Sequence, residues 1–187
     1  MTISRGARWA LAGAGVIAIA GAAAVLWPRS EAEATPEPLP VVTVQAHPEV
    51  ELPYTVGTPS GCPSLSYRSS VESAAGTNIR LSSGSQRPSM FNVVCFPIDS
   101  FGSVDELVAW KMAHRVDSQL VGQPVWEVGA MGRSVRTELD MGSGTLITEW
   151  LAEREGKLVI AGYYHHDDDP VGASDVADAM VASWEWR

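Results

Sequence analysis

The residues best suited to chemistry run from His165 to Asp169 and read His-His-Asp-Asp-Asp. Imidazole nitrogens and carboxylate oxygens are the ligands that zinc, manganese and similar ions take in proteins. Because neighbouring side chains on a strand point to opposite faces, only one of His165 and His166 joins Asp167 and Asp168 easily. A metal site is therefore the weaker interpretation, and a polar strand end that leads into a turn is the stronger one.

Other catalytic motifs are missing from the sequence. The HExxH zinc motif, the GxSxG nucleophile elbow and the phosphate-binding GxxxxGK[ST] loop do not occur. Glu153 and Glu155 are paired carboxylates, but they fall at an expected strand end, where charge on a solvated face explains them. We therefore expect a protein that is not an enzyme, takes no cofactor and binds a ligand that remains unknown. The alternative is a metal-dependent enzyme that uses the His165–Asp169 cluster.

Two cysteines, Cys62 and Cys95, are the second chemical feature of the chain. On the oxidising side of a membrane, two cysteines are most simply one disulfide. Closing a loop of about 34 residues stabilises a fold by roughly 3–4 kcal/mol in the chain-entropy model. Two buried free thiols are the alternative. No CxxC pair is present, so a thioredoxin-like redox role has no support.

Residues 9–27 form a run of nineteen uncharged residues that begins and ends with Trp. As a helix this run is about 28 Å long, close to the roughly 30 Å hydrocarbon core of a bilayer. The apolar region of a signal peptide is shorter, at about 7–15 residues, which favours an uncleaved anchor. The alternative is a protein that is secreted after cleavage at Ala34, because Ala32-Glu33-Ala34 fits a small-x-small cleavage site.

The charges around this run predict its orientation. Arg5 and Arg8 precede it, whereas acidic residues dominate the stretch after it. By the positive-inside rule, residues 1–8 form a cytoplasmic stub and the C-terminal part is extracytoplasmic. The sequence therefore predicts a single-pass cell-membrane protein whose residues 9–27 have the lipid bilayer as their partner.

Residues 28–51 are rich in proline and acidic residues, a composition typical of an extended tether. Within it, Val41 to Val44 has some strand character. The extracytoplasmic domain is expected over residues 52–187. From Thr35 to Arg187 the chain has 10 Lys and Arg against 20 Asp and Glu, and this balance argues against a nucleic-acid partner.

The domain is expected to contain six strands and two helices. The expected strands cover residues 64–70, 78–82, 90–98, 134–141, 145–154 and 157–164, the last three as an antiparallel meander. Ser103 and Glu106 form a capping box that predicts a helix to about residue 119. Apolar residues at helical spacing predict a second helix over about 174–183.

The order of these elements resembles that of the PsbP/Mog1-like fold. The resemblance rests on this order, on the turn before Lys157-Leu-Val-Ile-Ala-Gly-Tyr-Tyr, and on the closing Met180-Val-Ala-Ser-Trp-Glu-Trp. It implies an α+β fold in which two helices flank an antiparallel sheet in an α/β/α sandwich, here preceded by one transmembrane helix. It also implies a binding or assembly factor with no shared catalytic residues. We therefore expect an envelope protein that binds a partner protein or ligand.

Overall fold

The computed structural model describes residues 41–43, 47–73, 78–81, 88–113, 119–166, 169 and 173–187. The chain divides into two units, Met1–Glu37 and Pro38–Arg187, and every described residue belongs to the second. The anchor expected at residues 9–27 lies outside the described residues. Among the residues that are described, no helix is long and apolar enough to cross a membrane.

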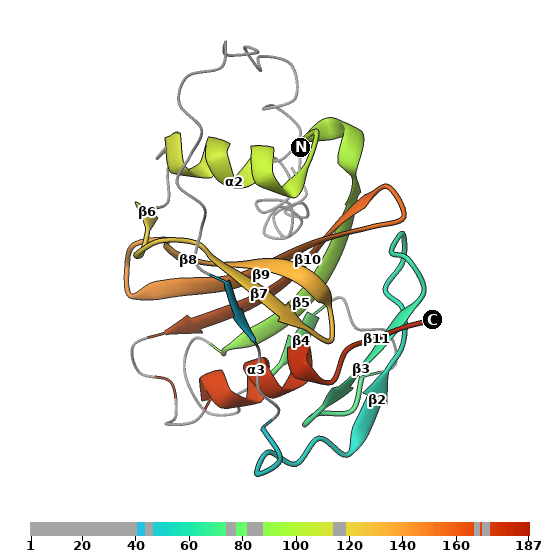
Figure 1. Ribbon diagram of the computed structural model, residues 1–187. Coiled ribbons are helices and arrows are strands. Elements are labelled where there is room, and N and C mark those ends of the chain that lie inside the picture. Colours follow the sequence, from blue (N-terminus) through green and yellow to red (C-terminus); the bar gives the residue numbers. More distant parts are fainter. Residues whose placement is uncertain are drawn as a thin grey trace, which may run out of the picture. The chain divides into compact units, whose positions relative to one another are not determined.

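A large sheet forms the centre of the described fold (Figure 1). Its strands follow the order β1-β7-β8-β9-β10-β5-β4, and β6 also pairs with β8. The β1–β7 pair is parallel, and the other pairs are antiparallel. The strands are β1 (Val41–Thr43), β4 (Asn78–Arg80), β5 (Met90–Pro97), β6 (Gln119–Leu120), β7 (Val125–Gly129), β8 (Gly132–Asp140), β9 (Thr145–Arg154) and β10 (Lys157–His166).

A small sheet and two α-helices complete the described part of the chain. The small sheet has the order β11-β3-β2, and a short 3-10 helix, η2, precedes the first α-helix. The elements are β2 (Tyr54–Val56), β3 (Leu65–Ser69), η2 (Ile98–Ser100), α2 (Val104–Ala113), α3 (Ala173–Ala182) and β11 (Glu185–Trp186). The structure is therefore a sheet-rich α+β fold, and the predicted fold class is confirmed at that level.

A tight turn sets the register of the predicted meander. Glu155 and Gly156 have φ angles of 51° and 69°, the left-handed values that a two-residue type I′ hairpin requires. The flanking residues pair accordingly, with Arg154 opposite Lys157. β8, β9 and β10 then follow one another in the sheet, which confirms the antiparallel meander.

The first helix begins where the capping box predicts. The Ser103 hydroxyl oxygen accepts a hydrogen bond from the backbone N–H of Glu106 at 3.1 Å, which satisfies one of the open donors of the first turn. The predicted end near residue 119 is wrong. Gln119 and Leu120 form β6, where pairing with β8 supplies hydrogen-bond partners that another helical turn would otherwise provide.

Alternating side chains of the central strands face two separate cores. α3 packs in the core that contains Trp150 and Val159, whereas α2 packs in the core that contains Leu151 and Leu158. Because neighbouring residues on a strand point to opposite faces, the two cores lie on opposite sides of the large sheet. Figure 1 shows α2 and α3 on these two sides.

A disulfide joins Cys62 to Cys95, as the sequence predicts. The two Cα atoms are 5.1 Å apart. Cys62 precedes β3 of the small sheet and Cys95 lies within β5 of the large sheet, so the bond connects the two sheets covalently. Both side chains also pack against the core on the α3 side.

Candidate functional site

The His-Asp cluster is divided between the two faces of β10. His165 Nε2 lies 3.3 Å from Thr148 Oγ1, and His166 Nδ1 lies 3.2 Å from Thr145 Oγ1. Residues 167–168 lie outside the described part of the chain. Within the described part, no three His, Cys, Asp or Glu side chains are grouped in a way that would hold a metal ion.

Asp169 folds back onto the end of β10. Its Oδ2 accepts a hydrogen bond from the backbone N–H of His166 at 3.0 Å and one from the Tyr163 hydroxyl at 3.5 Å. Burial raises the pKa of Tyr163 to about 12, and the charge of Asp169 acts in the same direction. The Tyr163 ring stacks on His165 with the centroids 4.9 Å apart. These contacts attach Asp169 to the end of β10.

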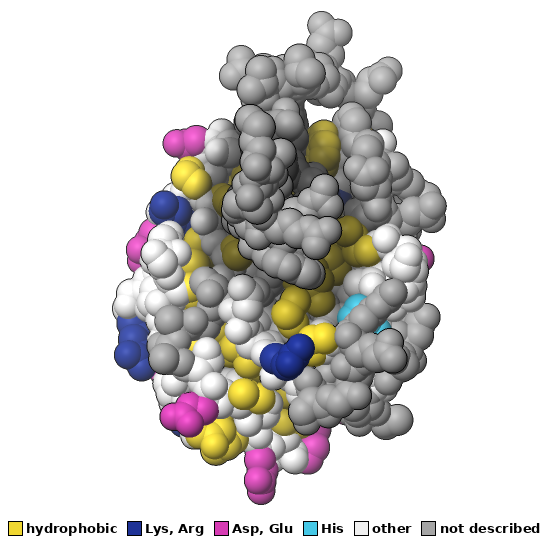
Figure 2. All heavy atoms as spheres, turned by 180° about the vertical axis from the view of Figure 1, so that it is seen from behind, with side chains coloured by type: hydrophobic (Ala, Val, Ile, Leu, Met, Phe, Trp, Pro, Cys, Tyr) yellow, Lys and Arg dark blue, Asp and Glu magenta, His cyan; other side chains and the backbone are white. Residues whose placement is uncertain are grey.

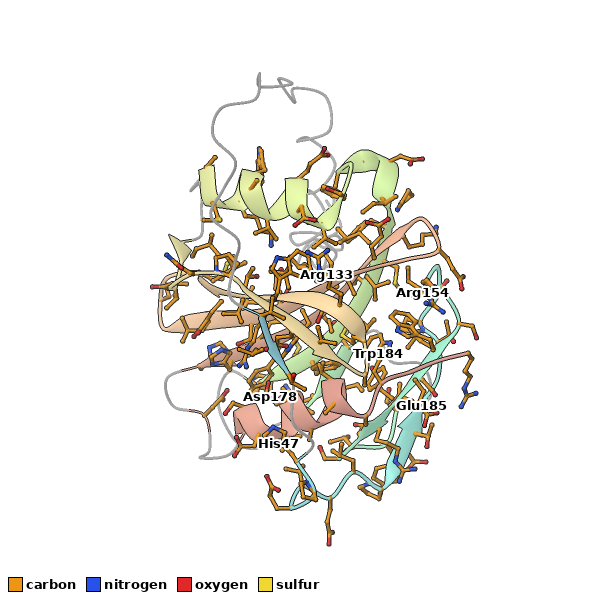
Figure 3. All side chains as sticks on the ribbon, in the orientation of Figure 1. His47, Arg133, Arg154, Asp178, Trp184 and Glu185 are labelled. Atoms are coloured by element: carbon orange, nitrogen blue, oxygen red, sulfur yellow. A yellow bond between two sulfur atoms is a disulfide. The ribbon has the colours of Figure 1, made fainter. Side chains whose placement is uncertain are left out.

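A charged cluster that sequence reasoning missed lies between the large sheet and α3. Arg136 on β8 is shared by two carboxylates, Glu127 on β7 and Asp178 on α3. Arg136 Nη1 is 3.8 Å from Glu127 Oε1 and 3.6 Å from Asp178 Oδ1. We call these three residues the Arg136 triad. Figure 3 labels Asp178 on α3 and His47 close to the same helix, and the charge of His47 lowers the pKa of Asp178.

Glu127 is the most enclosed member of the triad. The residue is 5% exposed, and its Oε2 atom is buried with no hydrogen-bond partner among the described residues. Burial raises the pKa of Glu127, and the charge of Arg136 opposes this shift. Burial also raises the pKa of Asp178, against the charges of Arg136 and then His47. The guanidinium carbon of Arg136 lies 5.4 Å from the ring centroid of Trp150.

Strand register explains how the triad assembles. Glu127 pairs with Ser134, which lies two residues before Arg136 on β8. Side chains two apart on a strand share a face, so Glu127 and Arg136 both lie on the α3 side. Ser134 is only 3% exposed, so this face of β8 is enclosed although its side chains are polar. Recognition of the Val125–Gly129 run as a neighbouring strand would have placed Glu127 beside Arg136.

His165 lies within the electrostatic reach of the same cluster. Burial lowers its pKa from the ordinary value of 6.5, while the carboxylates of Glu138 and Asp169 oppose the shift. The charges of His166 and Arg136 lower it further. Because the folded-state pKa lies below the unfolded value, protonation of His165 costs stability as the pH falls below 6.5. The arrangement therefore keeps this imidazole neutral.

No protein-family model matches this chain, and no curated protein matches its sequence significantly. A crystal structure of a protein from Bacteroides thetaiotaomicron aligns with 66% of this chain and 45% of that chain, at 11% identity. The chain therefore spans less than half the length of that protein. The TM-score is 0.35, and a likeness at this level carries no argument about fold or function.

Proposed function

We propose that this protein is a membrane-anchored, extracytoplasmic binding or assembly module of the bacterial cell envelope. The Cys62–Cys95 disulfide carries the proposal, because disulfides persist in oxidising compartments. The apolar run at residues 9–27 supplies an anchor of bilayer length. The Pro-rich acidic residues 28–51 form an extended tether between the anchor and the domain, although β1 (Val41–Thr43) is a strand within this range.

Binding is proposed over catalysis because the enclosed charges serve the fold. The Arg136 triad connects α3 to β7 and β8. On the other face, Lys111 of α2 pairs with Glu149 of β9, which also accepts a hydrogen bond from Thr137. Each of the two described α-helices is thus attached to the large sheet by an ion pair, a structural role that needs no catalysis.

Exposed apolar side chains favour a partner for this domain. Figure 2 shows hydrophobic side chains near the centre of one face, with a histidine next to them and acidic side chains toward the outline. Large exposed hydrophobic residues occur on several elements, and they include Val41, Val71, Met112 and Val128. Apolar surface of this kind is typical of interaction sites when it is contiguous.

The finer fold assignment is also a proposal. We infer a PsbP/Mog1-like α/β/α sandwich, which is supported by the packing of α2 and α3 in cores on opposite faces of the sheet. The resemblance to this fold implies a binding or assembly factor, which is consistent with the proposed role. The small β11-β3-β2 sheet is a feature that the sequence-based resemblance did not include.

Single added cysteines test export and binding together. The native cysteines are paired, so Val41→Cys, Val71→Cys, Met112→Cys and Val128→Cys each add one exposed thiol. In intact cells, a membrane-impermeant maleimide that carries a photoreactive group should label these variants and, after illumination, give a discrete larger adduct from at least one of them. The buried Val135→Cys variant is the control and should stay unlabelled.

Two outcomes would contradict the proposal, and they concern separate parts of it. Labelling that appears only after cell lysis would place the domain on the cytoplasmic side. Labelling from outside without any adduct from the four positions would leave export intact and contradict the binding role.

A further inference from the structure

Arg136 is shared by two carboxylates at distances that are too long for direct hydrogen bonds. Its Nη1 atom is 3.6 Å from Asp178 Oδ1 and 3.8 Å from Glu127 Oε1, whereas N–H···O bonds are about 2.7–3.2 Å long. The Arg136 side chain is 39% exposed, so its guanidinium has room to move. One cation therefore divides its attraction between a strand carboxylate and a helix carboxylate.

We propose that the Arg136 triad is a proton-operated latch. When Glu127 is protonated, Arg136 pairs with Asp178 alone, and this stronger ion pair holds α3 more tightly on the sheet. Glu127 belongs to the same sheet as Arg136, so their attraction does nothing to hold the helix. The Arg136–Asp178 contact, in contrast, joins the sheet to α3. Neutralising the competing carboxylate therefore strengthens the contact that holds the helix.

The buried oxygen of Glu127 favours protonation of this residue, although a hydrogen bond from the Trp150 indole to the carboxylate opposes it. An ionised carboxylate can only accept hydrogen bonds, and the buried Oε2 atom has no donor among the described residues. A proton removes the cost of that buried charge. The ordinary pKa of this side chain, 4.5, is also above the 3.8 of Asp178, and burial raises both.

Charged groups on the surrounding elements set the pH range. The charge of His47, which lies before β2, lowers the pKa of Asp178, whereas the charge of Asp175 on α3 raises it. On β10, the charge of Asp178 contributes to raising the pKa of Tyr163, and the charge of Arg136 contributes to lowering that of His165. The carboxylates of Glu138 on β8 and Asp169 after β10 raise the pKa of His165.

The sign of the pH effect follows from the direction of these shifts. The folded-state pKa of Glu127 lies above the unfolded value, so the folded protein binds this proton more tightly. Because the charge of Asp178 on α3 contributes to raising the pKa of Glu127, release of α3 lowers that pKa. Attachment of α3 therefore strengthens as the pH falls through the folded-state pKa of Glu127.

Hydrogen exchange of the α3 amides tests the latch in the full chain in detergent. The opening equilibrium of Ala173–Ala182, normalised to β9 and β10, should fall on acidification from pH 7.5, by at most about tenfold per pH unit for one proton. The Glu127→Gln variant should be protected already at pH 7.5 and should show no further gain in acid. The exposed Glu153→Gln variant is the matched control and should follow the parent.

The Asp178→Asn variant keeps the test decisive if Glu127→Gln does not fold. It lacks the charge that Arg136 moves to, so the protection of α3 should not increase on acidification. The parent pH dependence retained in either variant would overturn the latch. A parent protein whose α3 protection does not rise in mild acid would overturn it as well.

Discussion

Removal of the Cys62–Cys95 disulfide is expected to lower the free energy of unfolding by about 3–4 kcal/mol. The two residues are separated by 33 positions, and a cross-link of this span restricts the unfolded chain. Since domains are stable by only about 5–15 kcal/mol, the loss is a large part of the total. The loss of stability should be largest in the small sheet, because the bond connects the segment before β3 to β5.

Urea unfolding of the Cys62→Ser/Cys95→Ser double variant measures this loss. The double variant is preferred to a single one because it leaves no reactive thiol behind. Parent protein that has been reduced under the same conditions is the matched control, and its midpoint should agree with that of the double variant. A double variant as stable as the oxidised parent would show that noncovalent packing alone holds the two sheets together.

Trp150→Ala is expected to destabilise the domain by about 3–5 kcal/mol. Trp150 is 1% exposed, lies in the core on the α3 side and approaches the Phe91 ring with centroids 6.4 Å apart. Its indole also favours the ionised form of Glu127 through a hydrogen bond. The substitution therefore opens a cavity in the core and removes the indole hydrogen bond to Glu127 of the Arg136 triad.

The same unfolding assay separates these two effects of Trp150. Trp150→Phe keeps an aromatic ring and loses the indole N–H, so its loss should be smaller than that of Trp150→Ala. Val128→Ala, at a side chain that is 48% exposed, is the surface control and should change stability by no more than about 0.5 kcal/mol. A Trp150→Ala loss as small as that of the control would contradict the described core.

Local signals in the sequence predicted the elements that neighbouring residues determine. The Ser103 capping box, the Glu155-Gly156 turn and the apolar faces of β9 and β10 act over a few residues, and the structure contains each of them. The pairing of Cys62 with Cys95 was predictable for another reason. With two cysteines in the chain, only one intramolecular pairing is possible, and an inferred oxidising compartment favours it.

Contacts between distant segments explain most of what was missed. β7 is a five-residue run with Glu127 at its centre, and its place is set by pairing with β8 on one side and with β1 on the other. Parallel pairing of β1 with β7 joins residues that are far apart in the chain, and no local sequence pattern predicts such pairing. β11 likewise owes its place to pairing with β3.

The candidate site shows the same limit. Alternation along a strand correctly separated His165 from His166, because it is a local property. The burial of Glu127 was not predictable in this way, because glutamate is mostly exposed in proteins and is enclosed chiefly when it is paired. The second carboxylate, Asp178, comes from a helix near the other end of the sequence, and only the folded chain brings both acids to Arg136.

We propose above that the extracytoplasmic domain stays attached to the membrane through residues 9–27. N-terminal sequencing of the mature protein from the membrane fraction tests it most directly, combined with protease treatment of intact cells. We expect a mature chain that retains residues 9–27, remains with the membrane and loses its C-terminal domain to protease from outside. A mature chain that begins at Thr35 and is found free of the membrane would contradict the anchored account.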